Sequence, residues 1–203
     1  MEKSTNRPAP EEPEVEARIA RRLRDLRRGM TLEALAERTG VSRSMISLIE
    51  RGEASPTASV LNRLAAGLGV TIAAFFDASP QPDASPLARG AAQPQWTDPD
   101  TGYVRRNLSP PGHPSSLQLV EVTLPAGAQV SYDAALRSPA QDQQVWVIEG
   151  RVRISVGEAT HDLEAGDCLA MRVDQVNGFR NRSRQKARYL VALAAAPAGR
   201  GRP

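Results

Sequence analysis

The sequence predicts a two-domain α + β protein in which a helical domain precedes an all-β domain. Its 203 residues suffice for one large domain or two small ones. Apolar residues recur at spacings of three and four before residue 77 and alternate with a period of two after residue 96. Between these patterns, residues 78–95 contain four prolines and are predicted to form a linker.

Both ends of the chain are expected to be disordered tails. Residues 1–13 are rich in proline and glutamate with almost no large apolar side chains, and residues 197–203 read PAGRGRP. The helical domain is therefore expected over residues 14–77 and the all-β domain over residues 96–196.

Five helices are predicted in the first domain from apolar stripes and from start and stop residues. Thr31, Ser42 and Thr57 are the expected N-caps of the second, third and fourth helices, because their hydroxyls can accept hydrogen bonds from free backbone amides. Residues 72–76 supply a short fifth helix. The inner faces are expected to carry Val15, Ile19, Leu23, Leu26, Leu32, Leu35, Ala36, Met45, Ile46, Ile49, Leu61, Leu64, Ala65 and Leu68.

Short strands separated by turn signals every 8–12 residues indicate that the second domain is a β-sandwich or small barrel. Alternating apolar residues mark strands near residues 117–122, 145–148 and 152–156. The chain has one cysteine and two histidines, so it has no internal disulfide and no cluster suited to structural zinc. No apolar run approaches the roughly 20 residues of a membrane span. We therefore expect a cytoplasmic protein with no membrane contact, and its net charge of +3 is weak evidence for an acidic partner.

Residues 32–51, LEALAERTGVSRSMISLIER, have the spacing that two steeply crossing helices require. Ala36 is small enough for the crossing, and Gly40 can adopt the positive φ of a tight turn. Val41, Ile46 and Ile49 follow as apolar anchors. The segment LAERTGVSRSMISLIERGEASPT resembles the lambda-repressor-like helix-turn-helix domain of the XRE family, and the resemblance covers residues 18–77.

This resemblance implies that the helix starting at Ser42 enters the major groove of double-stranded DNA. Since Met45, Ile46 and Ile49 are expected to face the core, the residues left to face the bases are Arg43, Ser44 and Ser47. Arg43 suits a bidentate contact to guanine. The expected phosphate contacts are Thr31, Ser42, Arg51 and Thr57.

The family often holds an internal ion pair at the position of Glu50. The end of the first helix, LRDLRRGMT, is about two residues shorter than usual, so the partner is expected to be Arg24 or Arg27. The remaining arginines of this helix fit either a solvated face or direct phosphate binding.

Residues 143–181 resemble a cupin, the small double-stranded β-helix barrel. QVWVIEG matches the first cupin motif and places Gln143 where a metal-binding Glu is usual; GDCLAMRVDQVNGFRN matches the second and places Asn177 where a ligand His is usual. The upstream ligand histidines would fall at residues 136–139, which read LRSP. Amide side chains are poor metal ligands, so we expect no metal or other cofactor. His113 and His161 are expected at the surface, and Cys168 is expected to be a buried small hydrophobe.

Regular alternation would place Gln143, Val145 and Val147 on the inner face of the barrel. The expected lining residues are Tyr132, Arg137, Gln143, Val145, Met171 and Asn177. Such a lining suits a small molecule with polar or carboxylate groups. A filled barrel that serves only for dimerisation is the alternative.

These features together predict a homodimeric transcriptional regulator that binds an operator and responds to a small-molecule effector. A single helix-turn-helix buries too little surface for specific binding, and dimers of such domains bind two half-sites. Two alternatives remain: a DNA-binding scaffold with an inert cupin, and a cupin metalloenzyme with a DNA-binding appendage.

Overall fold

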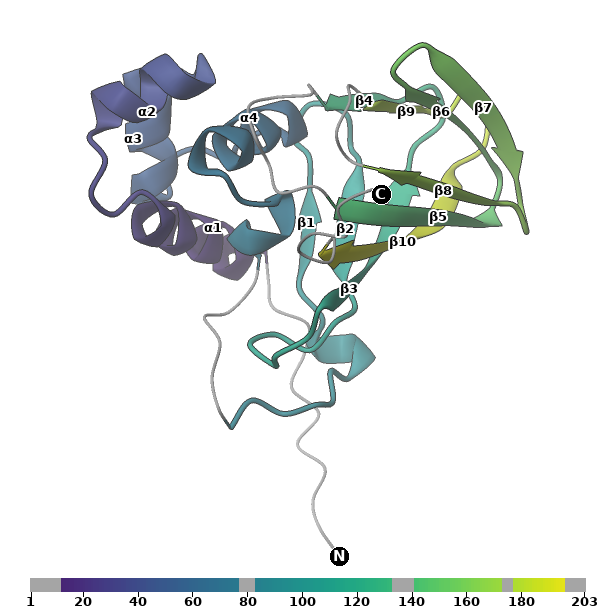
Figure 1. Ribbon diagram of the computed structural model, residues 1–203, viewed down its shortest axis with the longest axis horizontal. Helices are drawn as coiled ribbons and strands as arrows, with labels where there is room; N and C mark the ends of the chain where they lie inside the picture. The colour runs from purple at the N-terminus through teal and green to yellow at the C-terminus, as the bar shows by residue number, and fades with distance from the viewer. Residues whose placement is uncertain (1–11, 77–82, 133–140, 173–176, 196–203) are drawn as a thin grey trace, which may run out of the picture.

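The computed structural model describes residues 12–76, 83–132, 141–172 and 177–195 and shows a helical part packed against a β-rich part (Figure 1). The helical part consists of α1 (Glu12–Leu26), α2 (Leu32–Thr39), α3 (Arg43–Arg51), α4 (Ala58–Leu68) and the short 3-10 helix η1 (Ile72–Phe75). The predicted short fifth helix is present as a 3-10 helix, because this four-residue segment closes i to i+3 hydrogen bonds, so the helical part has four α-helices. None of the described helices has the length and apolar character needed to cross a lipid bilayer.

Helices α2, α3 and α4 begin at the three predicted N-caps. The hydroxyls of Thr31, Ser42 and Thr57 each accept a hydrogen bond from the backbone N–H three residues later, at 3.1, 3.2 and 3.3 Å. Helix α1 begins at Glu12, so residues 12 and 13 of the predicted tail are helical; a proline is tolerated in the first turn, where no intrahelical donor is needed. The rest of the predicted tails, residues 1–11 and 197–203, lies outside the described residues.

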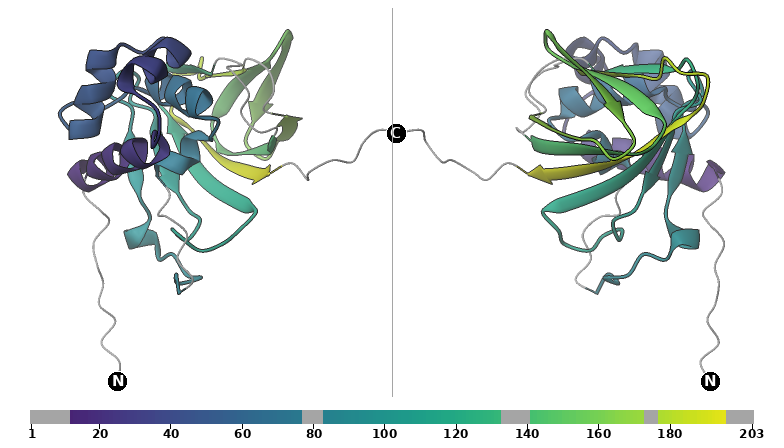
Figure 2. Two further views of the ribbon diagram at one scale, coloured as in Figure 1. Left: turned by 60° about the vertical axis from the view of Figure 1, so that its left-hand side comes forward. Right: turned by 90° about the vertical axis from the view of Figure 1, so that its right-hand side faces the viewer.

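The β-rich part contains two antiparallel sheets, which lie face to face (Figure 2). The six-stranded sheet has the order β1 (Gln95–Thr97), β2 (Val104–Asn107), β3 (Leu117–Leu124), β10 (Ala187–Ala195), β5 (Gln141–Glu149) and β8 (Cys168–Arg172). The four-stranded sheet has the order β4 (Gln129–Tyr132), β9 (Asn177–Arg180), β6 (Arg151–Val156) and β7 (Ala159–Glu164). The rings of Phe179 in β9 and Tyr189 in β10 stack at 5.5 Å, so apolar side chains join the two sheets. We call the space between the sheets the barrel interior.

The end of the predicted linker is part of the folded structure. Residues 77–82 lie outside the described part, whereas Gly90–Ala92 form the short helix η2 and β1 already starts at Gln95. Pro94 is buried, and its carbonyl accepts a hydrogen bond from the N–H of Asn107 at 2.9 Å. Proline suits this position because it precedes an edge strand, where no ladder donor is required.

The helical and β-rich parts share one cluster of buried apolar side chains. Phe76, which follows η1, lies 5.8 Å from Trp96 of β1 between ring centroids. The N–H of Ala58, at the start of α4, donates to the carboxylate of Asp98 at 3.3 Å. In addition, α1 packs against β1 and α4 packs against β4. These contacts fix the orientation of the helices relative to the sheets.

Candidate DNA-binding face and barrel interior

The turn between α2 and α3 is held by its own backbone and by one buried hydroxyl. Gly40 has φ 65°, the left-handed conformation, and its N–H donates to the carbonyl of Ala36 at 2.9 Å. The hydroxyl of Thr39 donates to the carbonyl of Leu35 at 2.7 Å and accepts from the N–H of Val41 at 3.2 Å. The angle between the two helices is therefore set by local hydrogen bonds.

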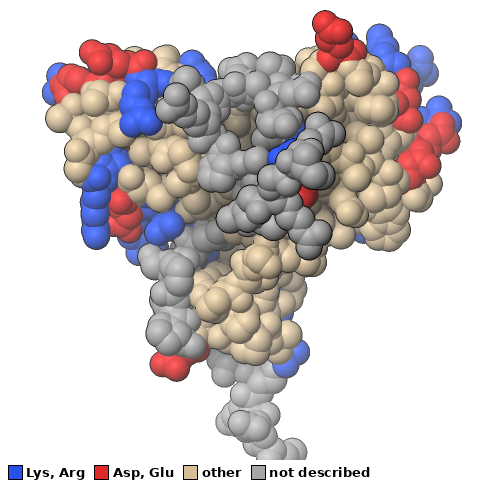
Figure 3. Space-filling view, viewed as in Figure 1, with Lys and Arg blue, Asp and Glu red and all other residues tan. Residues whose placement is uncertain are grey.

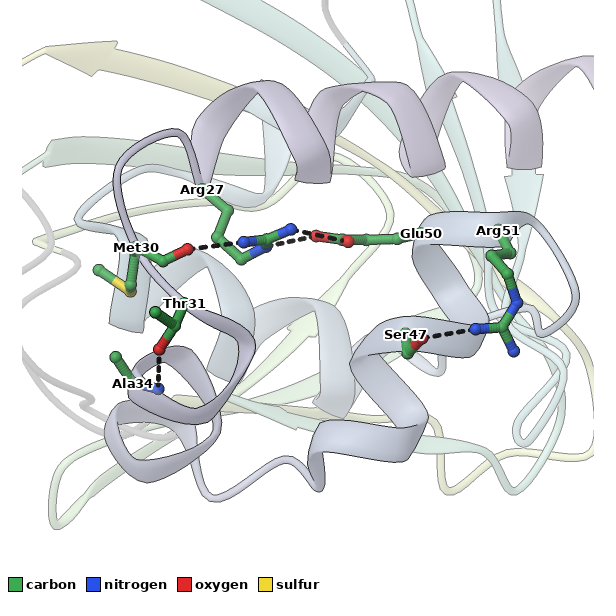
Figure 4. Close-up of polar contacts among 7 residues, drawn as sticks. All are labelled: Arg27, Met30, Thr31, Ala34, Ser47, Glu50 and Arg51. Atoms are coloured by element: carbon green, nitrogen blue, oxygen red, sulfur yellow. Dashed lines mark hydrogen bonds and ion pairs between the residues drawn. The ribbon is translucent and has the colours of Figure 1, made fainter.

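A bidentate ion pair joins α3 to the end of α1 (Figure 4). Arg27 donates from Nε and Nη2 to the two carboxylate oxygens of Glu50, at 2.6 and 3.0 Å, and from Nη1 to the carbonyl of Met30 at 2.6 Å. The hydrogen bond with Glu50 raises the pKa of Arg27 above its usual value. Of the two expected partners of Glu50, the structure shows Arg27.

The first turn of α3 presents polar side chains to solvent. Ser42, Arg43 and Ser44 are exposed, and Ser47 is half-buried. Nε of Arg43 lies 2.8 Å from a carboxylate oxygen of Glu33 on α2, and the hydroxyls of Ser42 and Ser44 lie 3.1 Å apart. Arg43 must exchange Glu33 for another acceptor in order to reach a base.

The other predicted contact residues lie at helix ends. Arg51, the last residue of α3, donates to the hydroxyl of Ser47 at 2.5 Å (Figure 4). It also donates to both carboxylate oxygens of Glu53 at 2.8 Å. The hydroxyls of Thr31, Ser42 and Thr57 already serve as caps. Basic and acidic side chains are interspersed over the helical part in the view of Figure 3, as these pairs imply.

Met45 does not face the core as predicted, because 37% of its surface is exposed. Ile46, Ile49 and Glu50 fill the inner face of α3, and Met45 lies at its margin, one residue or about 100° around the helix from Ile46. A stripe of apolar residues gives the direction of the inner face but not its width. Met45 is therefore an exposed apolar residue next to Ser44, and the sequence pattern did not predict its exposure.

The barrel interior contains most of the predicted lining residues. Gln143 and Asn177 are 8% and 4% exposed, Val145 is fully buried, and Met171 is half-buried. Gln143 is opposite Met171 in the register of β5 and β8, whereas Asn177 is opposite Tyr132 in β9 and β4. The structure therefore places these two amides on different sheets. Arg137 lies outside the described residues.

Two tyrosines in this region, Tyr132 and Tyr189, have pKa values well above the usual value of a tyrosine. Burial, reinforced by the nearby hydroxyl of Tyr103, raises the pKa of Tyr132 well above its usual value. Burial likewise raises the pKa of Tyr189. Both hydroxyls therefore remain neutral hydrogen-bonding groups at any pH at which the protein works.

Sequence reasoning missed two buried polar residues on β2, Arg105 and Asn107, each 7% exposed. Arg105 is opposite Trp96 of β1 and Val122 of β3. The sequence VRRN has no alternation of apolar and polar residues, so the pattern does not predict β2 as a strand. It therefore does not predict that Arg105 and Asn107 are buried.

The expected surface positions of the two histidines agree with the structure, but Cys168 does not lie in the core. His161 lies exposed on the edge strand β7, and His113 is exposed with its ring nitrogen 3.3 Å from the carbonyl of Ala84. Cys168 is exposed, because it lies on edge strand β8 opposite Trp146, whose side chain points out of the barrel. No group of three His, Cys, Asp or Glu side chains suited to a metal occurs in the described part of the chain. The amides of Gln143 and Asn177 do not fit the metal that cupins commonly hold.

Comparison with known proteins supports both halves of this arrangement. A helix-turn-helix family model matches residues 21–75, and a cupin domain model matches residues 120–193. The HTH-type transcriptional regulators SutR and PuuR of Escherichia coli K12 are similar over both parts. SutR is 29% identical over 162 residues, covering 80% of this chain and 85% of SutR, and PuuR is 25% identical over 176 residues, covering 85% and 92%.

A solved structure has the same combination of parts. The HTH_3 family transcriptional regulator from Vibrio cholerae is 29% identical, with a TM-score of 0.70, and the match covers 92% of this chain and all of that one. A match of this extent includes the helical part, the sheets and their packing together. The chain is therefore an XRE-family, DNA-binding transcriptional regulator with a C-terminal cupin domain.

Proposed function

We propose that this regulator binds a two-part operator as a homodimer and that a small-molecule effector in its cupin barrel, a double-stranded β-helix, changes its affinity for DNA. The observation that carries the effector proposal is the pair of buried amides, Gln143 and Asn177, inside the barrel interior. Buried polar groups in an otherwise apolar lining are typical of a binding pocket. Such a regulator acts on the chromosome and therefore in the cytoplasm.

The DNA contacts follow from the exposed face of α3. Arg43 is proposed to leave Glu33 and donate to guanine in the major groove, with Ser44 and Ser47 as additional polar contacts. Met45 supplies an apolar contact of the kind that a thymine methyl group accepts. The remaining contacts are to phosphates, from the helix starts at Thr31, Ser42 and Thr57 and from Arg51.

Replacing Arg43 by alanine is expected to weaken binding to the operator by about 1–3 kcal/mol and to relax discrimination at one base pair. Fluorescence anisotropy with the operator and with substituted operators measures both effects. Arg24→Ala is the matched control, because it removes one exposed arginine from α1 and the same net charge. Equal losses on operator and random DNA would show that Arg43 does not read a base.

The proposed dimer contact is the outer face of the six-stranded sheet. Trp146 and Leu117 are 47% and 45% exposed there, and in the sheet Trp146 is flanked by Leu190 and Cys168. Ion pairs flank the same face, among them Arg188 with Glu121 and Arg172 with Asp142. A face with an apolar centre and charges of both signs at its border can pair with a second copy of itself.

The Trp146→Glu variant is therefore expected to be a monomer, because the dimer would bury two carboxylates in an apolar contact. Sedimentation equilibrium measures this change, and Leu87→Glu, at another exposed apolar residue, is the control. The variant should keep weak binding to a single half-site and lose the additional affinity for two. A Trp146→Glu protein that sediments as the wild type does would exclude this face as the dimer contact.

The effector proposal is tested by thermal-shift screening with amino acids, amines and organic acids, since a ligand that binds only the folded state raises the Tm. A hit must also change operator affinity. A barrel that no compound stabilises would favour the DNA-binding scaffold. We infer that the chain is not an enzyme, and stoichiometric iron or manganese in the purified protein would instead favour a metalloenzyme.

A further inference from the structure

The side chain of Arg105 is buried without an acceptor for two of its nitrogens. It is 7% exposed, and Nε and Nη2 are buried without a hydrogen-bond partner among the described residues. The guanidinium lies over the ring of Phe76, whose centroid is 5.5 Å from the guanidinium carbon. Because a guanidinium stays charged in a protein, such burial is costly unless an anion or acceptor compensates it. Arg27 is the contrast, with Glu50 and a carbonyl satisfying its guanidinium.

The neighbouring carboxylates of the described part are engaged elsewhere. Asp98 accepts from Ala58 and from the hydroxyl of Thr101, and Glu121 lies on the opposite face of the sheet beside Arg106. Two residues beyond Arg105, on the same face of β2, the side-chain oxygen of Asn107 is also buried without a partner. A donor group and an acceptor group thus remain unsatisfied side by side.

The surroundings of Arg105 are aromatic. In the register of the six-stranded sheet, Trp96, Arg105, Val122 and Tyr189 form one row across four strands. Tyr189 stacks on Phe179, and the ring of Tyr132 meets Phe179 edge-on at 6.0 Å. Burial raises the pKa of both tyrosines and the positive charge of Arg105 opposes that rise, so their hydroxyls lie within its electrostatic reach.

We propose that Arg105 binds the carboxylate of the effector, and that Asn107 accepts a hydrogen bond from a hydroxyl or ammonium group of the same molecule. This inference rests on the proposed function and adds to it a residue and a ligand class. An arginine presents two parallel N–H donors to a carboxylate, which is the group that would satisfy Nε and Nη2 together.

This position also connects the barrel interior to the DNA-binding helices. Arg105 lies on Phe76, and the preceding 3-10 helix accepts a hydrogen bond at the carbonyl of Ala74 from Arg22 of α1, at 3.0 Å. The same helix α1 is followed by Arg27, which holds Glu50 of α3. A ligand on Arg105 therefore lies at the boundary between the barrel and the helices that orient α3. If the ligand binds one orientation of these helices more tightly than another, it changes the affinity of the protein for DNA.

The first test is the stability of the ligand-free protein. Arg105→Met is expected to keep or raise the Tm, because it replaces an uncompensated buried charge by an apolar side chain of similar length. Arg27→Met should lower the Tm, since it leaves Glu50 without its partner. A fall for Arg105→Met as large as that for Arg27→Met would show that Arg105 is structural and would overturn the proposal.

The second test uses acetate, with acetamide as its uncharged counterpart of the same shape, at constant ionic strength. At about ten times its Kd, acetate should raise the Tm of the wild type by about 3–6 °C relative to chloride, and acetamide should not. The increment should vanish in Arg105→Met and persist in Arg106→Met, whose side chain faces Glu121 on the other side of the sheet. In a Trp146→Phe background, Trp96 beside Arg105 should report the same binding by fluorescence.

Acetate effects that are absent, or equal in all three proteins, would contradict a carboxylate site at Arg105. Operator binding by Arg106→Met, which retains Arg105, is measured in parallel without added carboxylate and is expected to match the wild type. In the wild-type protein, retained operator binding together with a missing acetate increment would refute this inference alone. Loss of operator binding by the wild-type protein would refute the proposed function instead.

Discussion

The Gly150→Ala variant is expected to be destabilised more than any other single substitution considered for this protein. Gly150, between β5 and β6, has φ 79°, and a Cβ there would lie 2.6 Å from the carbonyl oxygen of Lys186 and 3.1 Å from Cα of Ala187. That backbone cannot retreat, because Ala187 begins β10, which is hydrogen-bonded between β3 and β5. A left-handed non-glycine residue and an overpacked contact together cost about 2–5 kcal/mol. Urea denaturation followed by circular dichroism measures the loss.

Gly127→Ala is the matched control for this experiment. Gly127 has nearly the same conformation, φ 75°, but nothing lies within 4 Å of the added Cβ. Its loss is expected to be limited to the conformational cost of about 1–2 kcal/mol. Similar losses for the two variants would mean that the close approach of Lys186 does not matter.

Glu50→Ala is expected to have the second largest effect, because it leaves Arg27 without its carboxylate. The side chains of Arg27 and Glu50 are 22% and 10% exposed, so the loss should be somewhat below the 3–5 kcal/mol typical of a fully buried pair, at about 2–3 kcal/mol. Since this pair positions α3, operator affinity should fall as well. Chemical denaturation and anisotropy on the same samples measure the two effects.

An exposed ion pair at the end of the same helix provides the comparison. Glu53→Ala removes the partner of Arg51, and both side chains are about half exposed and screened by solvent, so the free energy of unfolding should change far less than in Glu50→Ala. If Glu50→Ala proved as mild as Glu53→Ala, the Arg27–Glu50 pair would not hold α3 in place.

The helical part could be predicted closely because its signals are local. N-caps, glycine stops and a stripe at helical spacing all act within one helix, and Thr31, Ser42 and Thr57 cap the helices as expected. The partner of Glu50 could be narrowed only to two arginines, because neighbouring turns of α1 present both toward the same region. Met45 was predicted to face the core but is exposed, because helical periodicity does not show how far a neighbouring helix covers the apolar face.

The β-rich part was less predictable because its burial depends on strands distant in sequence. Cys168 and Trp146 share one row on the outer face of the sheet, although GDCLAM reads as a buried strand. Arg105 is buried only because Phe76 and Trp96 cover it from another part of the chain. No local pattern reveals such a covering contact. The amides at Gln143 and Asn177 were accessible to sequence reasoning because family motifs fix their positions.

The packing of Phe76 on Trp96, with the hydrogen bond from Ala58 to Asp98, has a consequence for operator architecture. In the proposed dimer, the helical part of each protomer, including α3, is fixed to its own barrel. The contact between the two barrels therefore sets the separation and the relative angle of the two α3 helices. B-DNA rotates by about 34° per base pair, as its 10–10.5 base pairs per turn require. Inserting five base pairs between the half-sites would turn one of them to the opposite side of the duplex. Spacer length is then a component of recognition as strict as the bases themselves.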